Sequence, residues 1–281
     1  MNGGPRSACV VGWPVKHSRS PQIHEYWIRQ HGLAGAYRRE EVMPETFEGF
    51  IQTLAERGYC GANVTLPHKE AALRLAIIAD EAARAIGAAN TLWLDDAFRL
   101  NASNSDAYGF VANLDAGAPH WNDGRKPVMV LGAGGAARAI VHGLLAEGAT
   151  RVVLTNRTRG RAEALAGAFG PAVTVVDWTK RDRALSDCSL LVNATSLGMT
   201  GKEPLNIDLT FLPPDAVVTD IVYSPLETPL LAAARARGNR TVDGLGMLLH
   251  QAVPGFERWF GVRPEVTPKL RAHVAASLGE R

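Results

Sequence analysis

Polar side chains gather directly after predicted strands in the first half of the chain. Ser18 and Ser20 lie in a loop after the apolar run at residues 8–12, and Lys69 follows a second apolar run at residues 61–65. Ligand-binding groups of α/β proteins gather beyond the carboxyl ends of strands, so we expect these groups to face one crevice. The other polar groups of this set are the side chains of Asn63, Thr65, Asn90 and Asp106.

This set of side chains suits a small carboxylic acid that carries hydroxyl groups. Serine hydroxyls can donate to a carboxylate, while amides and a carboxylate can bind a diol. Taken singly, the residues have other interpretations. Ser20 could cap the helix that follows it, Asn90 could cap a helix or form a turn, and Lys69 could be solvated.

Lys69 and Asp106 are the candidates for moving a proton. Oxidation of a secondary alcohol removes a hydride from carbon and a proton from oxygen, so a proton acceptor must lie within about 2.6–3.2 Å of the hydroxyl. Burial would lower the pKa of the Lys69 ammonium, whereas a nearby carboxylate would favour its charged form. We expect the pair to share the proton, and the sequence leaves open which residue holds it.

A glycine-rich turn in the middle of the chain predicts a dinucleotide site. It connects the apolar run Val128–Leu131 to a helix expected at residues 136–147. Gly132 permits a tight turn, Gly134 lets the backbone approach a pyrophosphate, and the helix N-terminus supplies free N–H groups. The residues expected at the cofactor are Gly132, Ala133, Gly134, Gly135 and Ala136.

The end of the next predicted strand favours NADP over NAD. An NAD site places an acidic residue about 20 residues beyond the glycines, to bind the ribose hydroxyls. Here that segment contains no carboxylate and offers guanidinium and hydroxyl groups, which suit a 2′-phosphate. The other interpretation is a solvated basic loop. The residues concerned are Asn156, Arg157, Thr158 and Arg161.

Alternating strands and helices must position these side chains, which predicts an α/β protein with mostly parallel sheets. Strands are expected at residues 8–12, 37–42, 61–65, 128–131, 151–155, 173–176, 190–193 and 217–221. Helices are expected at residues 21–31, 47–56, 136–147, 161–169, 229–237, 247–260 and 268–278. Two helices after a complete α/β unit suggest that the chain returns to its first domain. We therefore expect a discontinuous substrate domain at residues 1–106 and 240–281, a dinucleotide domain at 107–239, and a ligand cleft between them.

Composition excludes several other classes of protein. The chain has 281 residues, 46% hydrophobic and 21% charged, and a net charge of +2, which is no basic field for nucleic acid or an anionic membrane. It shows neither a signal peptide nor an apolar stretch long enough to span a membrane. Three scattered cysteines argue against disulfides and zinc, and the histidines lack ligand-like spacing, so we expect no metal. A cytoplasmic protein is expected.

Together, the motifs resemble one enzyme family. In chain order the sequence carries KHSRSP, NVTLPHK, GAANTL, NSD, GAGGAARA, NRT, NATSLGM, DIVYSPLETPL and GLGMLLHQA. This ordered set, which runs over residues 9–259, resembles shikimate dehydrogenase. The resemblance implies an NADP-dependent oxidoreductase that interconverts 3-dehydroshikimate and shikimate on the pathway to aromatic amino acids. It also implies a substrate domain, a Rossmann-like NADP domain, and a monomer or homodimer.

The resemblance assigns roles to matched residues. Ser18 and Ser20, with Tyr223, would bind the substrate carboxylate. The substrate hydroxyls would be bound by Asn63, Thr65, Asn90 and Gln251, beside the pair Lys69 and Asp106. NADP would be bound by Gly132 to Ala136, then by Asn156, Arg157, Thr158 and Arg161, with Ile221, Gly244 and Met247 near its nicotinamide end.

Three departures from the family pattern and three alternatives remain. Ser105 replaces a common threonine, Ala89 a common valine and Glu25 a common asparagine, and none of them removes a proposed catalytic group. One alternative is a quinate/shikimate dehydrogenase with relaxed substrate or NAD use, against which Ser20 and the arginine loop argue. The others are a non-catalytic NADP-binding regulator and a folate-type dehydrogenase.

Overall fold

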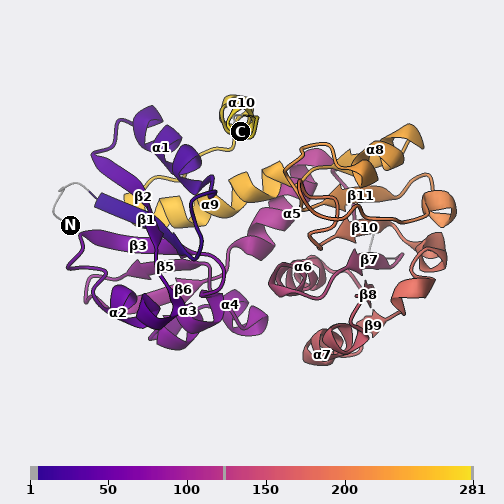
Figure 1. Ribbon diagram of the computed structural model, residues 1–281, viewed down its shortest axis with the longest axis horizontal. Helices are drawn as coiled ribbons and strands as arrows, with labels where there is room; N and C mark the ends of the chain where they lie inside the picture. The colour runs from indigo at the N-terminus through magenta and orange to yellow at the C-terminus, as the bar shows by residue number, and fades with distance from the viewer. Residues whose placement is uncertain (1–5, 123–124, 280–281) are drawn as a thin grey trace. The chain divides into compact units, whose positions relative to one another are not determined.

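The chain folds into two compact α/β units, which a computed structural model describes over residues 6–122 and 125–279 (Figure 1). The first unit extends to Ser105 and resumes at Gln251, and the second spans Asp106–His250. Residues 1–5, 123–124 and 280–281 lie outside the described residues; they include the start of the chain and part of the polar loop expected at residues 117–126. The domain ranges expected from the sequence stay predictions.

The first unit is built on a mixed six-stranded sheet in the order β2-β1-β3-β5-β6-β4. Its strands are β1 (Arg6–Gly12), β2 (Gly35–Glu41), β3 (Tyr59–Val64), β4 (Ile78–Ala79), β5 (Thr91–Leu94) and β6 (Leu100–Ser103). β1 pairs in parallel with both β2 and β3, so the carboxyl ends of these three strands lie at one edge. β5 runs antiparallel to both β3 and β6.

Helices cover both faces of this sheet. They are α1 (Ser20–Gln30), α2 (Phe47–Gln52), α3 (Lys69–Leu75), α4 (Glu81–Ile86), the second part of α9 (Leu245–Phe260), and α10 (Pro268–Ala276). α2, α3 and α4 pack Phe50, Ala72 and Ala83 into one apolar core with the sheet. On the other face, α1 and α9 bring together His24, Trp27, Phe256 and Trp259. The chain therefore completes its first unit with its last helices.

The second unit contains a sheet of six parallel strands in the order β12-β11-β10-β7-β8-β9. Its strands are β7 (Val128–Leu131), β8 (Val152–Thr155), β9 (Val173–Val175), β10 (Leu190–Asn193), β11 (Val217–Asp220) and β12 (Arg240–Val242). The central strands are buried along their whole length, which explains their short, uninterrupted apolar runs.

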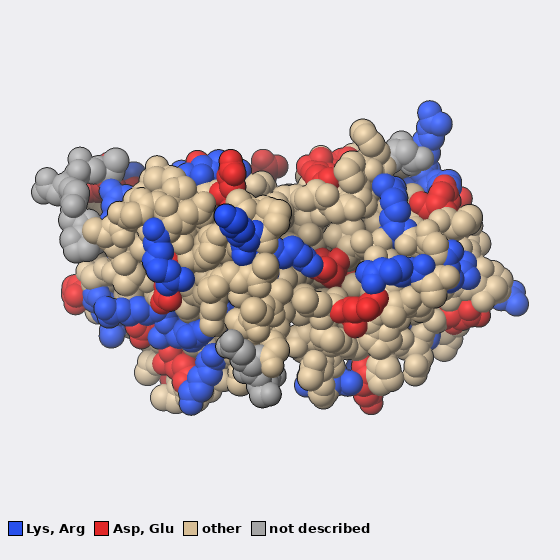
Figure 2. All heavy atoms as spheres, turned by 90° about the horizontal axis from the view of Figure 1, so that it is seen from above, with Lys and Arg blue, Asp and Glu red and all other residues tan. Residues whose placement is uncertain are grey.

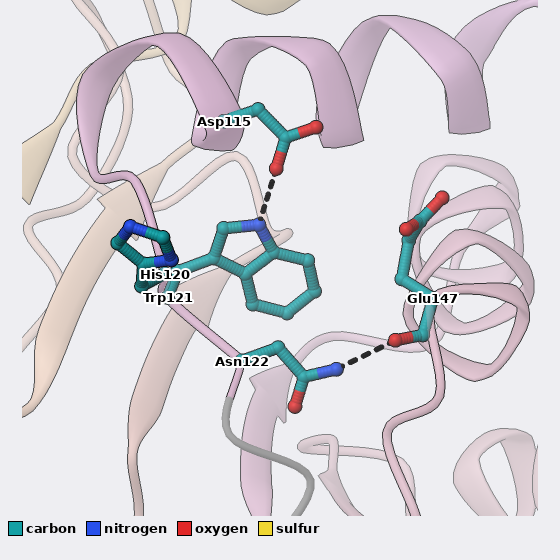
Figure 3. Close-up of a pocket in the computed structure, with 5 residues that line it drawn as sticks. All are labelled: Asp115, His120, Trp121, Asn122 and Glu147. Carbon is teal, nitrogen blue, oxygen red and sulfur yellow. Dashed lines mark hydrogen bonds between the residues drawn. The ribbon is translucent and has the colours of Figure 1, made fainter.

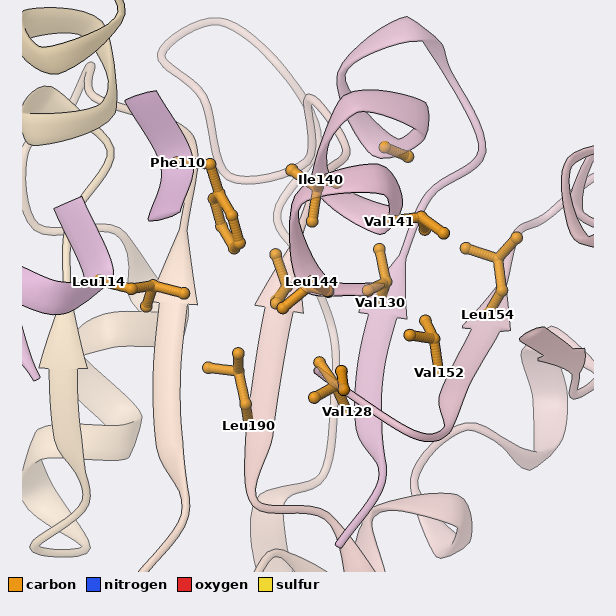
Figure 4. Packing of buried hydrophobic residues seen from close by; sticks show 14 of the residues in the cluster. Phe110, Leu114, Val128, Val130, Ile140, Val141, Leu144, Val152, Leu154 and Leu190 are labelled. Atoms are coloured by element: carbon orange, nitrogen blue, oxygen red, sulfur yellow. The ribbon is translucent and has the colours of Figure 1, made fainter. Parts of the chain in front are cut away.

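This parallel sheet also lies between two apolar layers. The helices of the unit are α5 (Asp106–Gly117), α6 (Gly135–Ala146), α7 (Arg159–Phe169) and α8 (Pro229–Ala236). α5, α6 and α7 share one core with β7 and β8, in which Phe110, Ile140 and Val130 are buried (Figure 4). α8 and short 3-10 turns cover the opposite face through Leu230 and Leu209. A sheet covered on both faces holds its strand ends rigidly, as a binding site at that edge requires.

The α/β class predicted from the sequence is confirmed, with differences in detail. The helix expected at residues 47–56 ends at Gln52, because the C-cap Thr53 leaves the helical conformation with φ −100° and ψ 16° and the chain then turns. The antiparallel strand β5 was not predicted, nor were α3, α4, α5, β4, β6 and β12.

Neither a membrane-spanning helix among the described residues nor a field of one charge on the face shown in Figure 2 is found. No helix among the described residues is long and apolar enough to cross a bilayer. Basic and acidic side chains are interspersed on the face shown in Figure 2. This distribution agrees with the small net charge of +2.

Candidate active site

The two serines predicted to bind a carboxylate lie together after β1. The Ser18 hydroxyl donates to the Ser20 hydroxyl at 3.2 Å, and the Ser20 backbone N–H donates to Ser18 Oγ at 3.3 Å. Arg39 holds the loop, because its Nη2 donates to the Ser18 carbonyl oxygen at 2.9 Å. The N-cap of α1 is Arg19 and Ser20 is the first residue of the helix, so Ser20 does not occupy the N-cap position.

Asn63 and Asn90 lie side by side next to this loop. Asn63 Nδ2 donates to the Asn90 carbonyl oxygen at 3.2 Å, and Asn63 Oδ1 accepts from the Tyr37 hydroxyl at 2.6 Å. Asn90 Oδ1 accepts from the backbone N–H of Ser105 at 2.9 Å and from the Thr91 hydroxyl at 2.9 Å. Both amides are therefore fixed by buried partners, and the Ser105 that replaces the family threonine still anchors Asn90.

Lys69 and Asp106 each begin a helix, the former in the first unit and the latter in the second. Lys69 is half-buried at the start of α3, and Asp106 is buried at the start of α5. Thr65 is half-buried beyond β3. His68, which precedes Lys69, is buried, stacks on Phe47 at 4.3 Å and bonds to the Val42 carbonyl oxygen, so it packs the core.

The glycine turn of the second unit has the shape that a dinucleotide needs. Gly132 has φ +110°, and a Cβ there would lie 2.9 Å from the Ala194 carbonyl oxygen, so only glycine fits. Gly134 is the N-cap of α6 and, because it has no side chain, leaves the N-terminus of the helix uncapped. A Cβ at Gly134 or Gly135 would meet nothing within 4 Å. An exposed, uncapped helix N-terminus with open space beside it fits a pyrophosphate.

The loop after β8 fits the adenosine end of NADP. Arg157, Thr158 and Arg161 are exposed and Asn156 is half-buried. Arg157 pairs with Glu203 at 3.3 Å, whereas Arg161 makes no ion pair with any described residue. Thr155, at the end of β8, has a buried hydroxyl with no hydrogen-bond partner among the described residues. Arg161 therefore offers an exposed guanidinium that pairs with no described carboxylate, whereas the Thr155 hydroxyl is enclosed in the protein.

The residues matched to the nicotinamide end lie at the other strand ends of the same sheet. Ile221 follows β11, and a Cβ on Gly244 would lie 2.3 Å from the Ile221 carbonyl oxygen, so their backbones touch. Met247 is buried in α9, and Tyr223 is half-buried two residues beyond Ile221. Gln251, at the start of the first unit's part of α9, is half-buried.

A buried carboxylate that sequence reasoning missed holds these strand ends together. Asp220 Oδ1 accepts from Asn193 Nδ2 at 2.9 Å and from the Val222 backbone N–H at 3.0 Å. Asp220 Oδ2 accepts from the Thr228 hydroxyl at 2.7 Å. Burial raises the pKa of this carboxyl, and the three donors oppose that shift. The signal available in the sequence was a lone carboxylate ending an apolar strand.

A separate hollow near the end of α5 contains none of the predicted site residues (Figure 3). It is lined by Asp115, His120, Trp121, Asn122 and Glu147. The indole N–H of Trp121 donates to Asp115 Oδ1 at 2.8 Å, and Asn122 Nδ2 donates to the Glu147 carbonyl oxygen at 2.7 Å. These polar groups serve the fold, and we assign this hollow no part in the chemistry.

Metal ligands do not gather in the described part of the chain. No group of three or more His, Cys, Asp or Glu residues there could hold a metal ion. The donors at the two sheet edges are hydroxyls, amides, guanidinium groups and backbone N–H groups. These are donors for an organic acid and a phosphorylated cofactor.

Comparisons with known proteins agree on one family. Residues 10–92 match the family model of the shikimate dehydrogenase substrate binding domain. Residues 119–200 match that of shikimate / quinate 5-dehydrogenase, and residues 244–268 that of the shikimate 5′-dehydrogenase C-terminal domain. A shikimate dehydrogenase (NADP(+)) of Nitrobacter hamburgensis is 58% identical over 97% of this chain and 95% of its own length.

Solved structures give the same result at lower identity. The shikimate 5-dehydrogenase of Thermus thermophilus, in complex with NADP(H) and shikimate, has a TM-score of 0.85 and 36% identity, covering 97% of this chain and 99% of its own. The quinate dehydrogenase of Corynebacterium glutamicum, in complex with NAD, has a TM-score of 0.90 and 31% identity, covering 97% and 99%.

Proposed function

This chain belongs to the shikimate dehydrogenase family, and on that premise we propose that it reduces 3-dehydroshikimate to shikimate, reversibly, with NADP. The observation that carries the proposal is the pairing of two polar groups at one edge of the first sheet. Ser18 and Ser20 offer hydroxyls for a carboxylate, and Asn63 and Asn90 offer amides for a diol. The substrate is therefore a small acid with neighbouring hydroxyls.

The second unit supplies the cofactor site. Gly132 to Ala136 would bind the pyrophosphate through the N-terminus of α6, and Asn156, Arg157, Thr158 and Arg161 would bind the 2′-phosphate. Ile221, Gly244 and Met247 would lie at the nicotinamide end. When bound, NADP supplies the hydride for reduction, or accepts it for oxidation. The protein's own task is to orient the substrate and to handle the proton.

We propose that Lys69 and Asp106 handle that proton together. In the oxidation of shikimate, the hydroxyl proton passes to this pair as the hydride leaves the same carbon. In reduction, the pair returns the proton to the new alkoxide oxygen, and the Lys69 ammonium stabilises the developing negative charge. Thr65 and Gln251 would bind the other substrate hydroxyls, and Tyr223 would assist Ser18 and Ser20 at the carboxylate.

Removal of the lysine side chain tests this assignment. Lys69→Ala is expected to lower kcat by two or more orders of magnitude, since general acid–base catalysis contributes about 10²–10⁴-fold. NADP⁺ affinity, measured by fluorescence titration, should stay close to wild type because Lys69 belongs to the first unit. Near-normal turnover in this variant would refute the role of Lys69.

The substrate and cofactor are tested by one absorbance experiment. Formation of reduced nicotinamide is followed after mixing the protein with shikimate or quinate, each with NADP⁺ or NAD⁺. The proposal expects a strong rate with shikimate and NADP⁺ alone. The structural similarity to a quinate dehydrogenase with NAD supports one second candidate, a quinate/shikimate dehydrogenase. Comparable rates with quinate or NAD⁺ would favour that enzyme, and silence in all four mixtures would favour a non-catalytic regulator.

Two finer properties belong to the same proposal. We place the enzyme in the cytoplasm, in keeping with three cysteine thiols that form no disulfide. We propose a monomer or a homodimer, which light scattering after size-exclusion chromatography distinguishes.

A further inference from the structure

Tyr37 is a buried phenol that touches both groups of proposed substrate ligands in the first unit. It lies on β2, is 1% exposed, and its hydroxyl is 2.6 Å from Asn63 Oδ1. The sense of this bond is fixed by the opposite end of the amide. Asn63 Nδ2 faces the Asn90 carbonyl oxygen, which can only accept, so Oδ1 must face Tyr37 and the phenol must donate.

The same phenol lies close to the serine loop. The Ser20 side chain acts on the Tyr37 phenol and opposes the rise of its pKa, and Ser18 donates to Ser20 at 3.2 Å. A tyrosine hydroxyl has one hydrogen and two lone pairs, so Tyr37 can donate to Asn63 and still accept from a nearby hydroxyl. Tyr37 therefore connects the serine pair to Asn63.

Aromatic packing holds the Tyr37 ring in place. His24 stacks on it with ring centroids 4.0 Å apart and planes 11° apart, and Trp259 lies against it at 5.9 Å. Burial raises the pKa of the Tyr37 phenol well above its usual value, so the hydroxyl keeps its hydrogen at neutral pH. Asn63 consequently has a permanent donor at a fixed place.

We propose that Tyr37 is a positioning residue that orients Asn63 and Ser20 for the substrate without touching it. It fixes which edge of the Asn63 amide faces a ligand, and it links the carboxylate-binding serines to the hydroxyl-binding asparagine. A substrate that meets both groups gains from their preorganised spacing. This inference rests on the proposed function, because it assumes that Asn63 and Ser20 bind the substrate.

Tyr37→Phe removes the hydroxyl and keeps the ring. Without the phenol, Asn63 Oδ1 is left buried with no donor, and the amide is free to reorient. We expect the KM for shikimate to rise about tenfold, with a smaller change in kcat and an NADP⁺ KM within about twofold of wild type. Tyr59→Phe is the matched control, since Tyr59 lies on β3 of the same sheet and donates to Glu40 instead.

A double-mutant cycle separates positioning from general loosening. If Tyr37 acts through Asn63, Tyr37→Phe should add little to the shikimate KM of an Asn63→Ala enzyme. Additive effects would overturn the proposal, as would a tenfold rise for Tyr59→Phe or an equal rise in the NADP⁺ KM. An Asn63→Ala enzyme with an unchanged shikimate KM would instead refute the assignment of Asn63 itself, and the positioning role would fall with it.

Discussion

His24 is a histidine that the fold keeps neutral. It is fully buried among aromatic rings, and neither ring nitrogen has a hydrogen-bond partner among the described residues. Burial lowers its pKa from 6.5 to about 3, and the nearby Asn63 side chain opposes this shift only in part. The His24 ring packs flat against Tyr37. Burial of its two unpaired nitrogens lowers the stability of the folded protein.

The neutral His24 makes stability depend on pH. Its folded pKa lies below its unfolded pKa, so the unfolded chain binds the proton first and stability falls as pH drops below about 6.5. Between pH 6.5 and 5 this one residue should cost about 2 kcal/mol. His24→Phe keeps an aromatic ring and removes the proton-binding site, so urea unfolding should lose that part of its pH dependence. An unchanged slope would contradict this account, and exposed His273→Gln is the control.

Two arginines of one helix differ in their availability to a phosphate. Arg159 is engaged by Glu163 at 2.6 Å and by Asp177, whereas Arg161 has no described ion-pair partner. We expect Arg161→Ala to raise the KM for NADP⁺ about tenfold or more, because a charge-assisted hydrogen bond is lost, and to leave the KM for NAD⁺ nearly unchanged. Arg159→Ala should have a smaller effect. An equal rise in the KM for NADP⁺ and for NAD⁺ would show that Arg161 does not bind the 2′-phosphate.

At the scale of elements, the turn between β7 and α6 contains two glycines that are needed for different reasons. Gly132 is needed by the protein, since its φ of +110° and the nearby Ala194 carbonyl oxygen exclude a side chain. Gly134 has an ordinary φ of −96°, and a Cβ there meets nothing in the protein. Its glycine is therefore explained by the ligand and not by the fold.

Substituting each of these glycines by alanine should give opposite results. Gly132→Ala is expected to lower the free energy of unfolding by about 1–3 kcal/mol, which thermal denaturation measures. Gly134→Ala should leave that free energy nearly unchanged and weaken NADP⁺ binding, measured by isothermal titration calorimetry. A Gly134→Ala protein that binds NADP⁺ as tightly as wild type would place the pyrophosphate elsewhere.

Elements with a strong local signal could be predicted from the sequence. Val128–Leu131 and Leu190–Asn193 were predicted to the residue, because strands buried on both faces are plain apolar runs. The segment after β3 could not, since α3 and α4 have seven and six residues and so show no clear period. β5 forms a hairpin with β6, but its place in the sheet depends on pairing with β3, far away in the sequence, which no local pattern records.

Candidate site residues could be predicted where they belong to a sequence motif, and could not where they act by positioning another residue. Ser18, Ser20, Asn63 and Asn90 stand in polar clusters after strands, so the sequence singles them out. Tyr37 begins a predicted strand with an ordinary strand-forming side chain, and only the fold brings its hydroxyl to Asn63. Positioning residues are set by tertiary packing, which leaves no local trace.

At the scale of the whole molecule, the first unit depends on contacts between the two ends of the sequence. Gly61 on β3 lies against Trp259 of α9, and a Cβ at residue 61 would be 2.1 Å from the indole nitrogen. That indole N–H donates to the Leu92 carbonyl oxygen at 2.9 Å. The absence of a side chain at Gly61 therefore allows α9 to pack closely against the sheet of the first unit.

Gly61→Ala should accordingly destabilise the protein. The added methyl displaces Trp259 and breaks its hydrogen bond, and overpacking of this kind costs about 1–3 kcal/mol or more. Urea denaturation followed by tryptophan fluorescence measures the loss. Gly49→Ala in α2 is the control, since a Cβ there meets nothing within 4 Å and alanine favours a helix. Equal stability of the two variants would refute this fit.

The interrupted course of the first unit sets an order of completion during synthesis. Residues 6–105 leave the ribosome first, yet Phe256 and Trp259, which cover His24, are made only after the contiguous unit Asp106–His250 is finished. Since domains fold as units as they emerge, the NADP half can be complete on a nascent chain while the substrate half still lacks its covering helix. A chain truncated near residue 250 and held on the ribosome by an added linker that spans the exit tunnel should thus resist protease over its second unit and be cut within its first.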